Sequence, residues 1–178
     1  MIGQPRRSGG IRWLPILLFG GYFLYYYFAN QSEVPLTGRS QLVDITRDQE
    51  MALGFEAYQQ LLQTERVVTQ GQVPQQVRAI AIRLIEAVRK LDPKADPGFE
   101  WDVNVIESPQ ANAFAMPGGK IAVYTGILPI TANVDGLAAV MGHEIAHAIA
   151  RHGAERMAYQ KLVQMGSMAA GMAISDMD

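Results

Sequence analysis

The chain has 178 residues, which is enough for one domain with an appendage. Its hydrophobic fraction of 49% suffices for a packed core, and its formal net charge of −2 excludes the basic field on which nucleic-acid binding depends. It contains no cysteine, so disulfides, thiolate metal ligands, cysteine nucleophiles and lipidation at cysteine are all excluded.

An uncharged apolar run covers residues 13–29 and follows Arg6, Arg7 and Arg12. At ~1.5 Å per residue this run is about 25 Å long, slightly short of a ~30 Å hydrocarbon core. The competing interpretations are a buried core helix and a cleaved signal peptide. Cleavage after Ala29 would place the bulky Tyr27 where a small residue is needed, so the pattern favours an uncleaved membrane anchor.

The charges around this run predict its orientation. Arginines before the run suit the cytoplasmic side, and the tyrosines at 25–27 suit the membrane–water interface. We predict a cytoplasmic segment 1–12, a single transmembrane anchor 13–29, and the bulk of the chain outside the cytoplasm. The predicted location is a bacterial inner membrane, with the folded domain facing the periplasm.

A polar linker is predicted over residues 30–45, and the folded domain over 46–178. The first helix of the domain begins near Thr46, where Thr46 and Gln49 can form a capping box, and it continues through Leu62. A second helix opens at Pro74 and shows apolar residues three and four apart as far as Leu91.

Strands are predicted next. Apolar and polar residues alternate from Phe99 to Val105, as in a half-buried strand. Pro117-Gly118-Gly119 is a turn signal between short runs at 113–116 and 121–124, which predicts a β-hairpin. Either run could offer an open edge to an extended peptide, and the first contains the candidate substrate-binding residues Ala113, Phe114, Ala115 and Met116.

The segment from His143 to His147 reads H-E-x-x-H within an apolar sequence of helical period. Two histidines four residues apart lie on one face of a helix, so both rings can reach one metal ion. Glu144 can then hold a water as general base, which is the signature of zincin metalloproteases. The alternative is a helix with two incidental surface histidines, but its apolar flanks make such polar residues costly unless they bind a metal.

On a continuous helix, the apolar stripe contains Leu137, Val140, Met141, Ile145 and Ala148, and the histidines lie beside it. His152 is five residues beyond His147 and is expected to point away from the ligand face, as a packing residue or an outer partner of the site rather than a ligand. Glu155 is two turns further along and is also not expected to be a ligand.

The run from Asn112 to Gly119, the strand ending Tyr124-Thr125-Gly126, the motif helix and Arg151-His152 together resemble the HtpX, CAAX-prenyl-protease and Oma-type zinc metallopeptidases, M48 gluzincins. The likeness covers roughly residues 45 to 157 and is closest to periplasmic soluble-domain members. It implies a zincin-like α+β fold, with helices packed on a small, mostly antiparallel sheet and the motif helix at its centre.

The resemblance also implies one zinc ion held by His143, His147 and a glutamate from a later helix, with Glu144 as catalytic base. No matching glutamate segment follows His147 in this sequence, so we expect the third ligand outside it and the sequence to be part of a longer enzyme. The implied substrates are misfolded envelope or membrane proteins. The alternatives are a catalytically incomplete member that acts as chaperone or adaptor, and a metal-binding module without proteolytic function.

Overall fold

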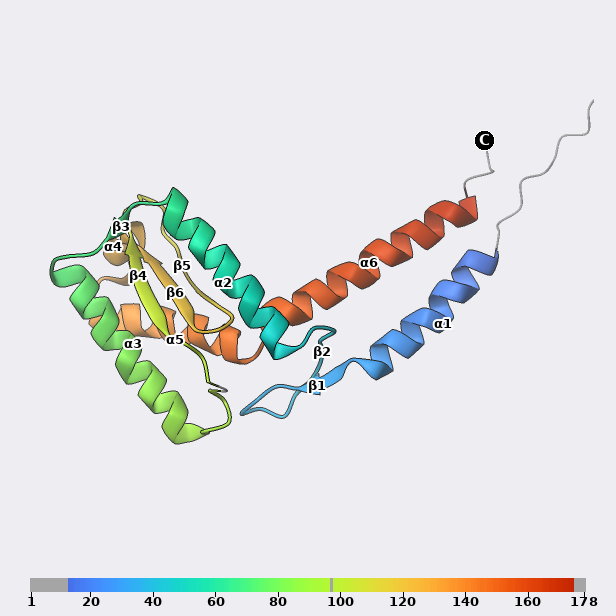
Figure 1. Ribbon diagram of the computed structural model, residues 1–178, viewed down its shortest axis with the longest axis horizontal. Coiled ribbons are helices and arrows are strands. Elements are labelled where there is room, and N and C mark those ends of the chain that lie inside the picture. The colour runs from blue at the N-terminus through green and yellow to red at the C-terminus, as the bar shows by residue number, and fades with distance from the viewer. Residues whose placement is uncertain (1–12, 97, 175–178) are drawn as a thin grey trace, which may run out of the picture. The chain divides into compact units, whose positions relative to one another are not determined.

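The computed structural model describes residues 13–96 and 98–174, and the predicted cytoplasmic segment 1–12 lies outside them. The described chain forms two compact units (Figure 1). The sheet unit contains residues 33–40 and 45–154, and the two-helix unit contains residues 13–32, 41–44 and 155–174. The H-E-x-x-H motif lies in the sheet unit.

The sheet combines β3 (Val67–Val68), β4 (Asp102–Ile106), β5 (Ala113–Met116) and β6 (Lys120–Tyr124) in the order β3-β4-β6-β5. The predicted hairpin is confirmed, because β5 and β6 pair antiparallel with Met116 opposite Lys120. Gly118 and Gly119 make the turn with φ of 82° and 85°, a region that favours glycine.

The prediction of a mostly antiparallel sheet is confirmed, although its central pair, β4 and β6, runs parallel. Strand β5 pairs with the outer side of β6 and does not lie between β4 and β6. It runs antiparallel to β6, so β6 runs in the same direction as β4. Strand β4 also begins at Asp102 rather than at Phe99. Its pairing with β3 is antiparallel.

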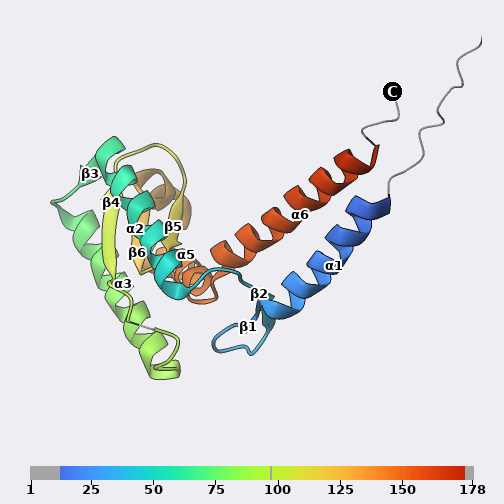
Figure 2. The same ribbon diagram turned by 45° about the vertical axis from the view of Figure 1, so that its right-hand side comes forward.

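Helices cover both faces of this sheet (Figure 2). On one face α3 (Gln72–Leu91) and α5 (Val134–Ile149) pack against alternate residues of the strands, including Val105, Ile121 and Val123. On the other face α2 (Arg47–Thr64) packs through Tyr58 against Ile106, Ala122 and Tyr124. The motif helix α5 is therefore a core element, as predicted.

The helix boundaries follow local sequence signals. Thr46 caps α2, and the predicted capping box with Gln49 is present in both directions, at 2.9 and 3.2 Å. Helix α3 begins at Gln72, two residues before Pro74, and ends at Leu91 as predicted. A 3-10 turn, η1 (Thr125–Ile127), and the short α4 (Leu128–Thr131) connect β6 to α5.

In the two-helix unit, α1 (Trp13–Ala29) lies beside the C-terminal part of α6 (His152–Ile174), in both Figure 1 and Figure 2. Short strands β1 (Gln31–Glu33) and β2 (Ser40–Leu42) pair within the predicted linker, so this segment is more ordered than its polar composition indicated. Among the described residues, none of the helices combines the length and apolar character needed to cross a bilayer.

Candidate metal centre

Helix α5 begins at a side-chain cap and presents its apolar stripe to the core. Asn133 accepts a hydrogen bond from the Gly136 amide at 2.9 Å, which satisfies one free amide of the first turn. The predicted stripe is largely confirmed, since Leu137, Met141 and Ile145 are buried while Val140 is only partly buried. This packing fixes the rotation of the helix and so decides where the motif residues point.

The two candidate ligands converge at the edge of that stripe. Nε2 of His143 lies 2.8 Å from Nε2 of His147, and the ring planes are nearly perpendicular at 84°. Two tetrahedral ligands with Zn–N bonds of ~2.0–2.1 Å would stand about 3.3 Å apart, so the two ring nitrogens would have to separate by about 0.5 Å to hold such an ion. Both imidazole nitrogens nevertheless point to one place, as ligands of one cation must.

We expected the motif histidines to be buried in the apolar helix, where an unpaired imidazole costs free energy, and this expectation was wrong in part. His143 is exposed, whereas His147 and Glu144 are half-buried. The pair lies at the margin of the buried stripe, where α5 leaves the core. An exposed imidazole has no burial cost to offset, so the argument for a metal rests on the convergence of the ring nitrogens instead.

His152 lies against His147, contrary to the expectation that it points away. The two Nδ1 atoms are 2.5 Å apart and the ring centroids 4.7 Å apart. That expectation assumed one continuous helix, but α5 ends at Ile149, and Arg151 adopts a left-handed φ of 59° before α6 begins. An occupied Nδ1 leaves Nε2 of His147 as the nitrogen available to a metal, an arrangement common among metal-binding histidines.

A buried ion pair that sequence reasoning missed holds this turn. Nε of Arg151 donates to Oε2 of Glu50 at 2.6 Å, and Nη2 donates to the Ile45 carbonyl at 2.8 Å. Both side chains are under 10% exposed. Burial lowers the pKa of Arg47 and the neighbouring charge of Arg151 lowers it further, while Glu50 opposes the shift. The pair joins the end of the motif helix to the start of α2.

No third ligand lies beside the histidines in the part of the chain that the structure describes. Across residues 13–96 and 98–174, no cluster of three or more His, Cys, Asp and Glu side chains is arranged to hold a metal ion. Glu155, in the first turn of α6, belongs to no such cluster within these ranges either.

Of the two candidate substrate strands, only β5 is placed at an edge of the described sheet. Strand β6 lies between β4 and β5, so its backbone is already paired on both sides, and all its side chains are buried. Within the described residues no strand pairs with the outer edge of β5, and α5 packs next to this strand. Ala113 is buried, while Phe114, Ala115 and Met116 are half-buried.

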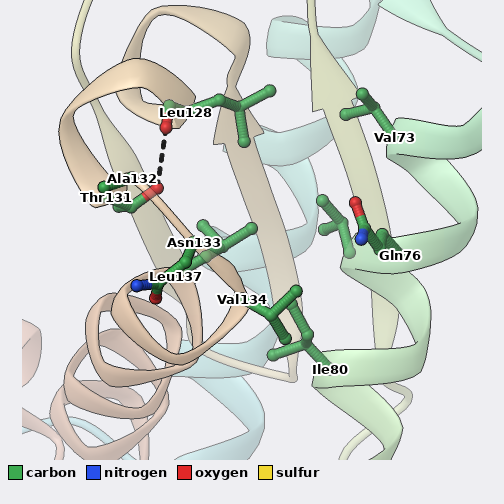
Figure 3. A pocket seen from close by; sticks show the side chains of 10 residues that line it. Val73, Gln76, Ile80, Leu128, Thr131, Ala132, Asn133, Val134 and Leu137 are labelled. Carbon is green, nitrogen blue, oxygen red and sulfur yellow. Dashed lines mark hydrogen bonds between the residues drawn. The ribbon is translucent and has the colours of Figure 1, made fainter.

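A separate cavity of about 290 Å³ lies between α3 and the α4–α5 connection (Figure 3). Val73 and Gln76 line it from α3, and Leu128 and Thr131 from α4, where the Thr131 hydroxyl donates to the Leu128 carbonyl at 3.1 Å. Its lining contains no titratable side chain and none of the motif residues. It therefore offers no acid–base or metal-binding chemistry to the candidate centre.

Comparison with known proteins identifies the family of the chain. The family model of peptidase family M48 matches residues 70–177. The chain is 38% identical over 150 residues to the mitochondrial metalloendopeptidase OMA1 of Saccharomyces cerevisiae, covering 79% of this chain and 43% of the relative. It is 31% identical over 141 residues to the human metalloendopeptidase OMA1, covering 78% of this chain and 26% of the relative.

A bacterial relative is more distant. The beta-barrel assembly-enhancing protease of Escherichia coli is 26% identical over 161 residues, covering 82% of this chain and 32% of that protein. The chain thus spans less than half the length of each of these three relatives.

Proposed function

Because the chain belongs to peptidase family M48, we propose that it carries the catalytic motif of a membrane-anchored zinc endopeptidase. The observation that carries the proposal is the convergence of the His143 and His147 Nε2 atoms, 2.8 Å apart on α5, with Glu144 between them in sequence. The histidines act as zinc ligands, and a glutamate is the expected third ligand.

Each motif residue has a distinct chemical role. Bound zinc supplies Lewis acidity, which lowers the pKa of a water towards ~7 and polarises a peptide carbonyl. Glu144 accepts the proton of the attacking water and passes it to the departing amine, so one carboxylate serves as base and then as acid. His152 holds the Nδ1 side of the His147 ring and keeps Nε2 directed outwards.

The substrate is an extended peptide segment, bound along β5. Its backbone groups pair with the open edge of Ala113–Met116, and the half-buried side chains of Phe114 and Met116 contribute contacts. Unfolded segments meet this requirement, because their backbone is free to pair. Misfolded envelope or membrane proteins are therefore the proposed substrate class.

The proposed location is a bacterial inner membrane, with α1 as a single-pass anchor and the sheet unit in the periplasm. The apolar α1 exposes large side chains along its length, such as Leu14, Leu17 and Phe28. The three arginines before Trp13 support the orientation.

Metal content and peptidase activity of the full-length gene product test this function together. Wild-type protein should retain about one zinc per chain by mass spectrometry and cleave casein, a largely unfolded protein. Glu144→Gln should keep the zinc and lose activity by at least ~10²–10⁴-fold, the usual contribution of a general base. The double variant His143→Ala, His147→Ala should lose both.

The control is Glu86→Gln, a matched change of an exposed glutamate on α3, which should keep zinc and activity. Stoichiometric zinc in the double histidine variant would remove the ligand assignment. Equal cleavage by wild type and Glu144→Gln would remove Glu144 from the mechanism. Zinc binding without cleavage in the wild type would favour the chaperone or adaptor alternative.

A further inference from the structure

The C-terminal part of α6 packs antiparallel on α1. Near one end of the pair, the Gly166 backbone approaches Phe19 so closely that a Cβ would stand 3.2 Å from its ring. Near the other, Tyr26 is buried with Ala158 and Leu162. Figures 1 and 2 both show the two helices side by side. Gly166 and Ala158 of α6 thus let the helices approach, while several other large apolar side chains of both helices are exposed.

Those large side chains form an exposed apolar surface on α6 as well as on α1. Val163 is 70% exposed, Met168 61% and Met172 54%. From Leu162 to Ile174 the sequence contains no charged residue. A helix that faces water normally carries charges on its exposed side, and residues 162–174 of α6 carry none.

The polar groups of this half of α6 are few, and Ser167 is satisfied internally. Its hydroxyl donates to the Val163 carbonyl at 2.9 Å, a bond that suits a helix in an apolar medium. Between the helices an apolar groove of about 380 Å³ is lined by Leu14, Leu18 and Phe19 of α1 and by Met165, Met168 and Met172 of α6. Flexible apolar side chains of this kind suit the disordered acyl chains of lipids.

Charge and aromatic groups gather at one end of the pair. Nζ of Lys161 lies 2.6 Å from Oδ2 of Asp44 and 5.3 Å from the centre of the Tyr26 ring. Tyr25 and Tyr27 flank Tyr26 in the same turn of α1. Clusters of tyrosine with lysine are typical of the membrane–water interface. The charge-free part of α6, residues 162–174, begins directly after Lys161 and continues away from the cluster of Lys161, Asp44 and the tyrosines.

We propose that residues 162–174 of α6 lie in the same lipid layer as α1 and contact lipid acyl chains. This inference rests on the proposed membrane anchor and extends it to a helical hairpin with its polar end at the interface. At ~1.5 Å per residue this part of α6 is about 20 Å long, so it enters the hydrocarbon region without needing to cross it. The occupant of the apolar groove is lipid.

The absence of cysteine allows a direct test by single-cysteine labelling. The intact protein is reconstituted in phosphatidylethanolamine–phosphatidylglycerol vesicles with an NBD label at Leu18→Cys, Met168→Cys, Gly171→Cys or Ile82→Cys. Gly171 has open space around its Cβ position, so this change does not disturb the packing of α6. Ile82, on the exposed side of α3, is the matched control in the sheet unit.

Brominated acyl chains should quench most of the emission at positions 18, 168 and 171, and little at position 82. Quenching at 18 without quenching at 168 and 171 would overturn the proposal for α6 and leave the anchor intact. No quenching at 18, 168 or 171 would overturn the anchor and the proposal together. Agreement between the 168 and 171 labels separates lipid contact from a local disturbance at either position.

Discussion

At the scale of single residues, Arg151 controls the geometry of the candidate centre without being part of it. Its left-handed conformation ends α5 and starts α6, so that His152 meets His147. A non-glycine residue in this conformation has a cost of order 1–2 kcal/mol. The bonds from Arg151 to Glu50 and to the Ile45 carbonyl offset that cost.

The first prediction concerns this ion pair. Glu50→Gln leaves the buried Arg151 charge without its carboxylate, and loss of one partner of a buried pair costs about 3–5 kcal/mol of unfolding free energy. Urea denaturation of the intact protein measures this. The control is Glu107→Gln in the exposed Arg66–Glu107 pair, which should cost under ~1 kcal/mol. Equal effects of the two changes would show that the Arg151–Glu50 pair does not hold the turn.

At the scale of elements, the hairpin is held by a close approach to α2. A Cβ on Gly54 would stand only 2.3 Å from the Pro117 carbonyl oxygen. On the same helix, the buried Tyr58 hydroxyl donates to the Ile121 carbonyl at 3.2 Å and accepts from Asn104. Burial raises the pKa of Tyr58, so the hydroxyl stays protonated and keeps this donor. Helix α2 therefore fixes the position of the turn between β5 and β6.

Gly54→Ala should destabilise the protein, although alanine favours a helix over glycine by ~1 kcal/mol. The clash with the Pro117 carbonyl forces a backbone shift, and overpacking of this kind costs about 1–3 kcal/mol. Gly171→Ala is the matched control, because the same change in α6 meets no atom within 4 Å and should be neutral or slightly stabilising. The midpoint of thermal unfolding distinguishes them, and a gain in stability for Gly54→Ala would contradict the close approach.

At the scale of the whole molecule, the chain separates an apolar helical pair from a domain with a conventional core. The sheet unit buries its apolar residues on both faces of one sheet, whereas the two-helix unit leaves many of them exposed. The proposed membrane association of the two-helix unit accounts for this distribution, because large exposed apolar patches mark membrane or protein interaction sites.

The corresponding prediction is one of topology. Alkaline phosphatase fused after Ser40 should be active, because it folds only after export, and green fluorescent protein fused at the same position should be dark. Matched fusions that lack residues 13–29 should reverse both signals. Fluorescence with inactive phosphatase in the complete fusions would place the domain in the cytoplasm and invert the proposed orientation.

Features that depend on neighbours along the chain were predictable from the sequence. The capping box at Thr46, the period of α3, the Pro-Gly-Gly turn and the H-E-x-x-H spacing all act within a few residues. A local pattern predicts such features because the atoms that interact are close in sequence. These features include the two candidate zinc ligands and the candidate base.

Features that depend on distant partners required the folded chain. The parallel pairing of β4 with β6 and the selection of β5 as the open edge depend on the order of strands in space. The contact of His152 with His147 depends on a helix break held by Glu50, 101 residues from Arg151 in sequence. Long-range contacts leave no periodic trace in the sequence, because their partners are brought together only when the core forms.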